Sequence, residues 1–408
     1  MPEQVILIDW DGFDPAVLER VETPNLDRLA KRGSLATGTG TFHTVSNPAR
    51  ASLSTGAHPA THNNAAYYFD DEANRARGQE RDLEAETIAE ALARQGRTLA
   101  SVQWYMVQDH GTAFGDPEHL YVRPGGDFGD RVDVAIDILN QRPVDSDGTE
   151  VIVPQIPDLL AVYGDELDSL AHQRGVDHPV IDEALAQMDA ELGRLVRATR
   201  DLGIYAETAF ILVSDHGMTS WNQTLLPQVR KAVQEAGYVP EIVTPGASPA
   251  EDAEVVIVPN SVRIGDITLR GAADSEQGRG QVRAALESLS PELISQVFDR
   301  AELDEMRASA KLGDLVAEAE PPYGFALGEP DEGEWRASHG STRELEVPFL
   351  VSGAGFRPVA LEEPSVVDVA PTIAALLGVD PPEGADGRVL VAVSSPAGDC
   401  EHAAGGRA

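Results

Sequence analysis

The sequence predicts an α/β protein built on a mostly parallel β-sheet. Three apolar runs, within residues 5–13, 209–217 and 347–353, show no polar alternation, which is typical of parallel strands covered on both faces. Segments with helical periodicity and capping residues separate these runs, so strands alternate with helices along most of the chain. In sheets of this kind the functional site lies at the carboxyl ends of the strands.

The N-terminal elements follow this alternation. After the first strand, a helix is predicted at 23–33, where a threonine caps the start, a proline fits the first turn and a glycine ends the helix. A helix at 83–97 leads into a strand at 98–105. Segment 124–150 is rich in Gly, Asp and Pro, and we expect it to form a loop.

The C-terminal half adds two strong helix signals. Residues 179–202 place apolar side chains at spacings of 4, 3, 4 and 3, which predicts an amphipathic helix leading into the strand at 209–217. A capped helix is predicted at 366–378. We expect it to follow the last strand and to complete the α/β alternation.

Segment 223–320 interrupts the alternation and predicts a smaller inserted cap that covers the site. The catalytic core would then consist of residues 1–222 and 321–393. The tail at 394–408 is small, polar and glycine-rich, so we expect it to be disordered. Its Cys400 is the single cysteine of the chain, which excludes an intramolecular disulfide and a cysteine-based metal site.

The chain is strongly acidic. It carries 68 acidic and 31 basic side chains, for a formal net charge of −37. Such a surface repels polyanions, so we expect no nucleic-acid polymer as a partner. Either a solvated acidic surface or adaptation to high salt, where charges are screened, explains this composition. An anionic substrate would need local positive charge, which metal ions could supply.

The sequence shows no sign of a membrane segment. It contains no apolar run of the roughly 18 residues that a spanning helix needs, and we expect no membrane partner. The opening residues, MPEQVILIDWDG, enter a strand without the basic region and longer apolar stretch of a signal peptide. We therefore expect a cytoplasmic protein.

Ionisable residues gather at the predicted strand ends and in the loops that follow. Taken singly, each has an ordinary explanation as a turn, surface or loop residue. Charged groups directly after a buried strand are nevertheless costly unless something uses them, and Asp and His four residues apart can meet on one helical face. The groups are Asp9 with Asp11, Asp168 with His172, Asp215 with His216, and His339.

Considered together, these groups predict a metal site. Three carboxylates and three imidazoles can hold two divalent ions, preferably zinc, with ions such as Mn²⁺ as an alternative. Two metals can clamp the attacking and leaving oxygens of an in-line phosphoryl displacement. The hydroxyl-rich stretch TVSNPARASLSTG at 44–56 would supply the nucleophile. The six residues are Asp11, Asp168, His172, Asp215, His216 and His339.

Eight motifs, in order, are LIDWDGF, TPNLDRLAKRG, SNPARASLSTGAHPATH, ELDSLAH, SDHGM, KLGDLVAEAEPPYGF, SHGS and DVAPTIAALLG. Because it carries these eight motifs in this order, the chain resembles the alkaline phosphatase superfamily. The resemblance is closest to the nucleotide pyrophosphatase/phosphodiesterase and phosphonoacetate hydrolase branches of that superfamily. The resemblance implies an alkaline-phosphatase-like three-layer sandwich with an inserted cap. It also implies hydrolysis of a small phosphorylated substrate, at phosphodiester or nucleotide pyrophosphate bonds.

The resemblance also implies roles for individual residues. One zinc would be bound by Asp11, Ser46, Asp215 and His216, and the other by Asp168, His172 and His339. Ser46 would be the nucleophile and form a covalent phospho-enzyme. Thr44 takes that role only if two residues are inserted relative to the family pattern.

Two positions depart from the family pattern. Diesterases of this family often place an asparagine 21 residues after the nucleophile, where this chain has Tyr67. We expect Asn63 or Asn64 to substitute for it in substrate binding. Arg50 follows the nucleophile in a pattern similar to the sulfatase signature, so it would either bind an anionic oxygen or brace the turn.

Three alternatives remain open at this stage. The first is a sulfatase acting through a modified Ser46, although His216 after Asp215 suits zinc, and Trp10 separates the two N-terminal aspartates. The second is a phosphonoacetate-hydrolase-like enzyme that cleaves a C–P bond. The third is a degenerate, non-enzymatic binding module, which the complete set of metal-binding positions disfavours.

Overall fold

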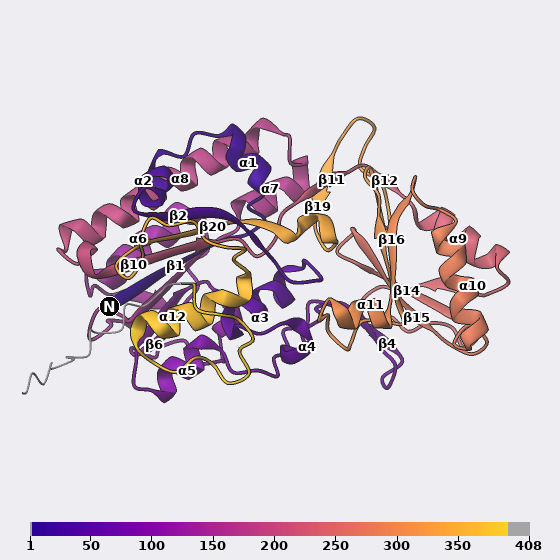
Figure 1. The fold of residues 1–408 in the computed structure, drawn as a ribbon, viewed down its shortest axis with the longest axis horizontal. Coiled ribbons are helices and arrows are strands. Elements are labelled where there is room, and N and C mark those ends of the chain that lie inside the picture. Colours follow the sequence, from indigo (N-terminus) through magenta and orange to yellow (C-terminus); the bar gives the residue numbers. More distant parts are fainter. Residues whose placement is uncertain (1, 391–408) are drawn as a thin grey trace, which may run out of the picture.

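The computed structural model describes residues 2–390, so the tail expected to be disordered lies outside the described residues. Its largest sheet has seven strands in the order β2-β20-β10-β1-β9-β5-β6 (Figure 1). Neighbouring strands are parallel except β20, which is antiparallel to both β10 and β2. The prediction of an α/β fold with a mostly parallel sheet is confirmed. The strands are β1 (Gln4–Trp10), β2 (Gly33–Thr39), β5 (Leu99–Val102), β6 (His119–Val122), β9 (Leu159–Gly164), β10 (Thr208–Val213) and β20 (Glu346–Gly353).

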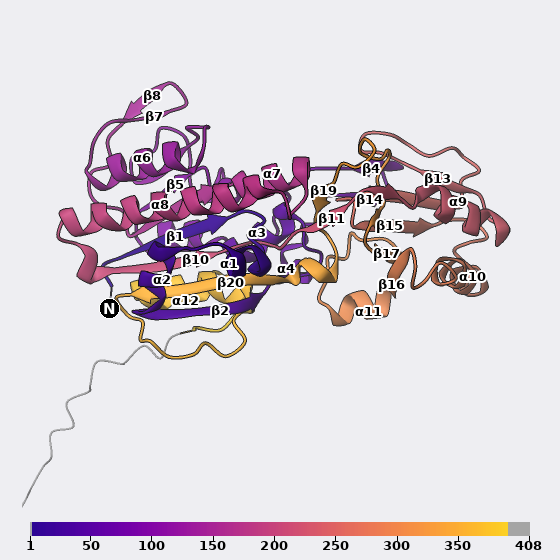
Figure 2. The same ribbon diagram turned by 90° about the horizontal axis from the view of Figure 1, so that it is seen from above.

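Helices cover both faces of this sheet and make three layers (Figure 1), and Figure 2 gives the view onto one of the helical layers. One face packs against α2 (Pro24–Ala30), α6 (Phe128–Leu139), α7 (Glu166–Arg174) and α8 (Pro179–Asp201). The opposite face packs against α3 (Ser46–Thr55), α5 (Ile88–Arg94) and α12 (Val369–Leu377). This arrangement explains why the strand sequences are continuously apolar, since neither face of the sheet meets water.

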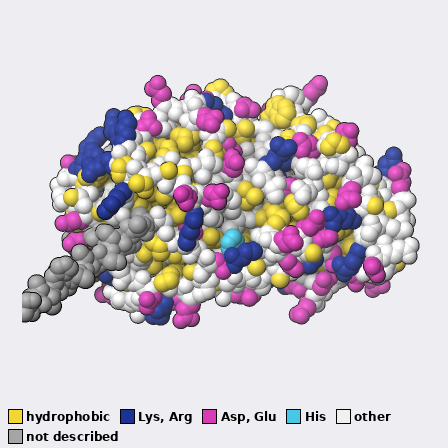
Figure 3. Space-filling view, viewed as in Figure 1, with side chains coloured by type: hydrophobic (Ala, Val, Ile, Leu, Met, Phe, Trp, Pro, Cys, Tyr) yellow, Lys and Arg dark blue, Asp and Glu magenta, His cyan; other side chains and the backbone are white. Residues whose placement is uncertain are grey.

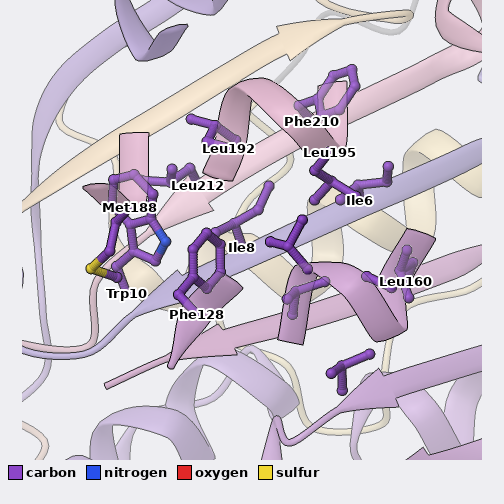
Figure 4. Close-up of a cluster of buried hydrophobic side chains, with 14 of the residues drawn as sticks. Ile6, Ile8, Trp10, Phe128, Leu160, Met188, Leu192, Leu195, Phe210 and Leu212 are labelled. Carbon is purple, nitrogen blue, oxygen red and sulfur yellow. The ribbon is translucent and has the colours of Figure 1, made fainter. Parts of the chain in front are cut away.

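Strand β1 illustrates how one strand serves both cores. Its side chains alternate between the faces, so Ile6 and Ile8 join the cluster that includes α8, whereas Val5 and Leu7 join the cluster that includes α12. Figure 4 shows the hydrophobic cluster on the α8 side of the sheet, in which Ile8 lies among side chains from β1, β10 and the helices that cover this face. The buried strand fixes the position of its polar C-terminal end.

The segment expected to be a loop at 124–150 is largely regular structure. It contains helix α6 and a hairpin of β7 (Val144–Ser146) and β8 (Thr149–Val151). Asp127 caps α6 in a reciprocal capping box with Asp130. The helix buries its apolar side against the core, so the prediction of a loop was wrong. The glycines and aspartates that suggested a loop mark the caps and the hairpin turn.

A second sheet forms from later residues and lies beside the seven-stranded sheet (Figure 1). Helices α9 (Leu226–Glu235) and α10 (Glu276–Glu287) pack on one face. The other face contacts α11 (Arg300–Glu305) and a hairpin of β3 (Tyr68–Asp70) and β4 (Arg75–Arg77) that extends from the first part of the chain. The five strands, in spatial order, are β13 (Pro240–Ile242), β14 (Val255–Asn260), β15 (Ile264–Leu269), β17 (Leu315–Ala319) and β16 (Ile294–Asp299).

Acidic residues are spread over the surface of both parts (Figure 3). No helix within residues 2–390 is both long enough and apolar enough to cross a lipid bilayer.

A buried carboxyl group makes the stability of the second sheet depend on pH. Asp266 in β15 is fully buried, and burial raises its pKa to about 7. The carboxyl group of Asp266 therefore binds its proton more tightly in the folded state than in the unfolded chain. The resulting stabilisation is complete below about pH 4 and is lost as the pH rises to about 7. We expect Asp266→Asn to raise the Tm at pH 8 but to have little effect at pH 4.

The substitution keeps an acceptor for the Gly313 N–H, which Asp266 Oδ1 accepts at 2.7 Å. Thermal unfolding at both pH values tests this prediction, with the exposed Asp252→Asn in the same region as the control. An equal change at both pH values, or the same change in the control, would contradict it.

Candidate active site

The predicted metal-binding residues meet at the carboxyl ends of β1, β9 and β10, as expected for a parallel sheet. Asp11 directly follows β1, and the Gly12 N–H donates to Asp215 Oδ1 at 3.3 Å. Gly12 has a φ of +66°, and a Cβ there would lie 3.0 Å from the Cα of Asp168. A glycine thus allows the loop after β1 to touch α7 and brings Asp11 near Asp168.

Asp11, Ser46, Asp215 and His216 form a first cluster. The Nε2 atom of His216 lies 3.0 Å from Asp215 Oδ2 and 3.5 Å from Asp11 Oδ1. The Ser46 Oγ lies 3.1 Å from the same nitrogen. Ser46 is the first residue of α3, so the start of this helix directs the serine hydroxyl toward His216.

Asp168, His172 and His339 form a second cluster beside the first. Asp168 Oδ1 lies 3.2 Å from His172 Nε2 and 3.6 Å from His339 Nε2. The rings of His339 and His216 stack with their centroids 3.7 Å apart, so the two clusters adjoin. The structure therefore brings together all seven residues that the resemblance assigned to metal binding.

The three histidines share an orientation suited to metal binding. In each ring Nδ1 faces a backbone carbonyl, at 2.8 Å for His172, 3.0 Å for His216 and 2.8 Å for His339. A carbonyl only accepts, so Nδ1 carries the proton. The Nε2 atoms then point at the carboxylates, and such backbone bonds commonly orient histidine ligands of metals.

The carboxylates of both clusters favour positive charge. Asp11, Asp168 and Asp215 each retain a buried oxygen without a hydrogen-bond partner among the described residues. Burial alone would lower the pKa of His216, but Asp215 and other carboxylates raise it to about 9. Burial would raise the pKa of Asp168, but His172 and the other histidines lower it to about 2. Two groups of these residues place their ligand atoms close enough together to hold a metal ion, namely Asp168 with His172 and His339, and Asp11 with Asp168 and His216. Carboxylates and imidazoles of this kind are suitable zinc ligands.

Arg50 supplies a buried positive charge behind the first cluster. Its side chain is fully buried and pairs with Asp9 at 2.8 Å, Asp11 at 2.9 Å and Asp215 at 3.1 Å. It also donates to the hydroxyl of Tyr105 at 2.9 Å. Arg50 does not line the cleft, so the geometry corrects the expectation that it binds substrate and favours the bracing role.

Thr44, the alternative nucleophile, is occupied by structural contacts. It is fully buried, donates to the Ser341 carbonyl at 2.8 Å and accepts from the Gly340 N–H at 2.9 Å. Ser46, in contrast, lines the cleft. The geometry therefore supports Ser46 as the nucleophile.

The cleft in front of these clusters has a volume of about 370 Å³, which suits a small-molecule ligand. Neither Asn63 nor Asn64 lines it, so the expected substitution for the family asparagine is not seen. Asn64 is fully buried, and its amide bonds the backbone carbonyls of Glu80 and Asp82. The amide of Asn63 instead donates to Glu84 Oε1 at 2.8 Å.

Sequence reasoning missed several residues that line the cleft. Asn47 directly follows Ser46 in the sequence, which was the one signal available for it. The others come from loops and short strands far apart in the chain. They are Gln79, Trp221, Ser261, Val262, Arg336 and Ser338, while Tyr67 lies in the cleft at the position of the family asparagine.

The family assignment follows from comparison with known proteins. Residues 5–342 match the family described as type I phosphodiesterase / nucleotide pyrophosphatase. The chain belongs to this family. The type I phosphodiesterase family lies in the alkaline phosphatase superfamily, so the resemblance seen in the motifs is confirmed.

Individual family relatives are distant. Human ectonucleotide pyrophosphatase/phosphodiesterase family member 5 is 23% identical over 247 residues, which cover 58% of this chain and 49% of the relative. A bis(5'-adenosyl)-triphosphatase of Xenopus laevis is 25% identical over 245 residues, covering 58% and 51%. The chain thus spans about half the length of the curated relatives it matches.

Solved structures of the type I phosphodiesterase family show the same fold. The human ectonucleotide pyrophosphatase/phosphodiesterase 5 structure matches with a TM-score of 0.70 at 20% identity, covering 93% of this chain and 96% of that chain. An inactive variant of the murine protein in complex with AMP matches with a TM-score of 0.69 at the same identity and coverage. These matches confirm the alkaline-phosphatase-like architecture.

Proposed function

We propose that this protein is a two-zinc hydrolase of phosphate esters that cleaves phosphodiester or nucleotide pyrophosphate bonds through Ser46. One observation carries the proposal: the Ser46 hydroxyl lies 3.1 Å from His216 Nε2, where two adjoining clusters of carboxylates and imidazoles meet. The AMP complex of the murine relative supports a small phosphorylated substrate.

The metal sites are proposed from the residues that fit them. Asp11, Ser46, Asp215 and His216 would hold one ion, and Asp168, His172 and His339 would hold the other. Bound zinc would supply Lewis-acid charge next to the phosphoryl oxygens and lower the pKa of the serine hydroxyl.

The residues of the chain position the reaction. Ser46 Oγ would attack the phosphorus in line with the departing oxygen and form a phospho-serine ester. With the phosphoryl group at Ser46, the first turn of α3 would present its positive dipole end to the phosphoryl oxygens and stabilise the charge that develops there. Attack by water would then release the phosphoryl product and restore the hydroxyl of Ser46.

We also propose that residues 223–320 act as a cap on the catalytic core. Ser261 and Val262, between β14 and β15, line the same cleft as Ser46. The Ser261 hydroxyl donates to the backbone carbonyl of His339 at 2.7 Å, which ties the cap to the second cluster. Of the described residues, 2–222 and 321–390 would form the catalytic core that this cap covers.

Activity toward matched nitrophenyl esters tests the proposed function. The zinc-loaded protein is expected to hydrolyse a phosphate diester faster than a phosphate monoester or a sulfate. Chelation of zinc should abolish this activity, and added zinc should restore it. His172→Ala is expected to lower the zinc stoichiometry, whereas His110→Ala, a surface histidine paired with Glu90, should not. Preference for the sulfate, or diester activity unaffected by chelation, would contradict the proposal.

A further inference from the structure

Two short paired strands form one wall of the cleft. In β11 (Thr219–Trp221) and β19 (Arg336–Ser338), Trp221 lies directly opposite Arg336, and Thr219 lies opposite Ser338. Directly opposed residues of an antiparallel pair project from the same face. Trp221, Arg336 and Ser338 all line the cleft that also contains Ser46 and His172.

This wall offers hydrogen-bond donors that the protein leaves unused. Arg336 is exposed, and it forms no ion pair within residues 2–390, whereas the nearby Arg343 pairs with Glu320 at 2.8 Å. Trp221 as a whole is 4% exposed, and its buried Nε1 has no hydrogen-bond partner in the described part of the chain. Guanidinium and indole N–H groups can only donate. An unpaired cation in the cleft is notable because the chain has a net charge of −37.

The wall is tied to the reacting end of the cleft. His172 Nδ1 donates to the carbonyl of Ala337, the residue after Arg336, at 2.8 Å. Arg336 is therefore adjacent in the strand to Ala337, whose carbonyl orients His172 of the second cluster. Ser46, Trp221 and Arg336 line one cleft, so a substrate with its phosphoryl group at Ser46 could reach these donors with its remaining part.

We propose that Arg336 and the Trp221 indole bind a second anionic group of the substrate, beyond the phosphoryl group that Ser46 attacks. This inference rests on the proposed function and narrows its substrate class to esters or anhydrides that carry a further phosphate or carboxylate. A planar guanidinium binds either group through two parallel hydrogen bonds. A plain diester with uncharged substituents leaves these donors unmatched.

Competing substrates test the proposal in the zinc-loaded protein. ATP carries additional phosphates, carboxymethyl nitrophenyl phosphate is a diester that carries a carboxylate, and bis-nitrophenyl phosphate carries neither. The measured quantity is kcat/KM for the substrate with the second anion divided by kcat/KM for the nitrophenyl diester. Arg336→Gln is expected to lower this ratio about tenfold, and Trp221→Phe is expected to lower it by less. Which of the two anionic substrates shows the loss distinguishes phosphate from carboxylate. Arg343→Gln, which removes a cation paired outside the cleft, should leave the ratio unchanged.

A binding measurement separates this proposal from the proposed function. The measurement uses zinc-loaded Ser46→Ala protein, with and without the additional substitution Arg336→Gln, and determines affinities by calorimetric titration. Arg336→Gln is expected to weaken the binding of inorganic pyrophosphate, or of phosphonoacetate, about tenfold more than it weakens the binding of inorganic phosphate. Equal effects on all three ligands, or no effect on any, would overturn the second-anion site even if the diester is hydrolysed. Failure to hydrolyse any phosphorus ester would instead contradict the proposed function.

Discussion

Replacement of Ser46 by alanine is expected to reduce phosphodiester hydrolysis about a thousandfold or more, because removal of the proposed nucleophile would eliminate the proposed covalent route. The Ser46 hydroxyl lies at the first residue of α3, 3.1 Å from His216 Nε2. Steady-state kinetics with a nitrophenyl diester measure the loss. The fold should be unaffected, since Ser46 Oγ makes no hydrogen bond to a residue outside the site within the described chain.

A serine of the same helix provides the control. Ser54 is buried in α3, but its hydroxyl only donates to the Ala51 carbonyl one turn earlier. Ser54→Ala should retain activity within about twofold, since surface or local changes usually cost little. Wild-type rates in Ser46→Ala would exclude Ser46 as the nucleophile. Loss of activity in Thr44→Val alone would shift that role to Thr44.

Replacement of Arg50 by methionine is expected to lower the free energy of unfolding by about 3–5 kcal/mol. Arg50 is the buried partner of Asp9, Asp11 and Asp215, and its removal leaves three carboxylates close together without their counter-charge. Denaturant unfolding of the metal-free protein measures this effect without interference from bound ions. Methionine keeps much of the side-chain volume, so the loss reports mainly on charge.

Two further variants make this prediction specific. Arg343→Met removes an arginine that is half exposed and paired with Glu320, and it should cost less than about 1 kcal/mol. The double variant Asp9→Asn/Arg50→Met removes one of the stranded charges and should recover part of the lost stability. An Arg50→Met protein as stable as wild type would contradict the bracing role.

The fold could be predicted from sequence because its strands are buried on both faces and its helices carry clear caps. The meeting of Asp11, Asp168 and Asp215 was also predictable, since carboxyl ends of parallel strands converge at one edge of a sheet. Helix α6 was missed because its capping aspartates and flanking glycines look like a loop until the helix buries its apolar side.

Other parts of the site depend on contacts that no local pattern encodes. Arg50 and Asp9 are 41 residues apart, and only the packing of α3 against β1 shows that the guanidinium faces the core and not the cleft. Trp221 and Arg336 lie on opposite sides of the inserted segment and meet through three residue pairs of β11 and β19. Asn63 and Asn64 looked available in the sequence but satisfy other polar groups in the fold.

The mass of the peptide that contains Ser46 shows whether the reaction passes through a phospho-serine. Trypsin releases residues 33–50 from the denatured chain, and this peptide can be weighed before and after an acid quench during turnover of a diester. We expect an unmodified serine peptide at rest and a peptide carrying the transferred phosphoryl group on Ser46 during turnover. A resting peptide that is lighter by two hydrogen atoms (formylglycine), or a phosphoryl group found only on another residue, would contradict an unmodified Ser46 as the nucleophile.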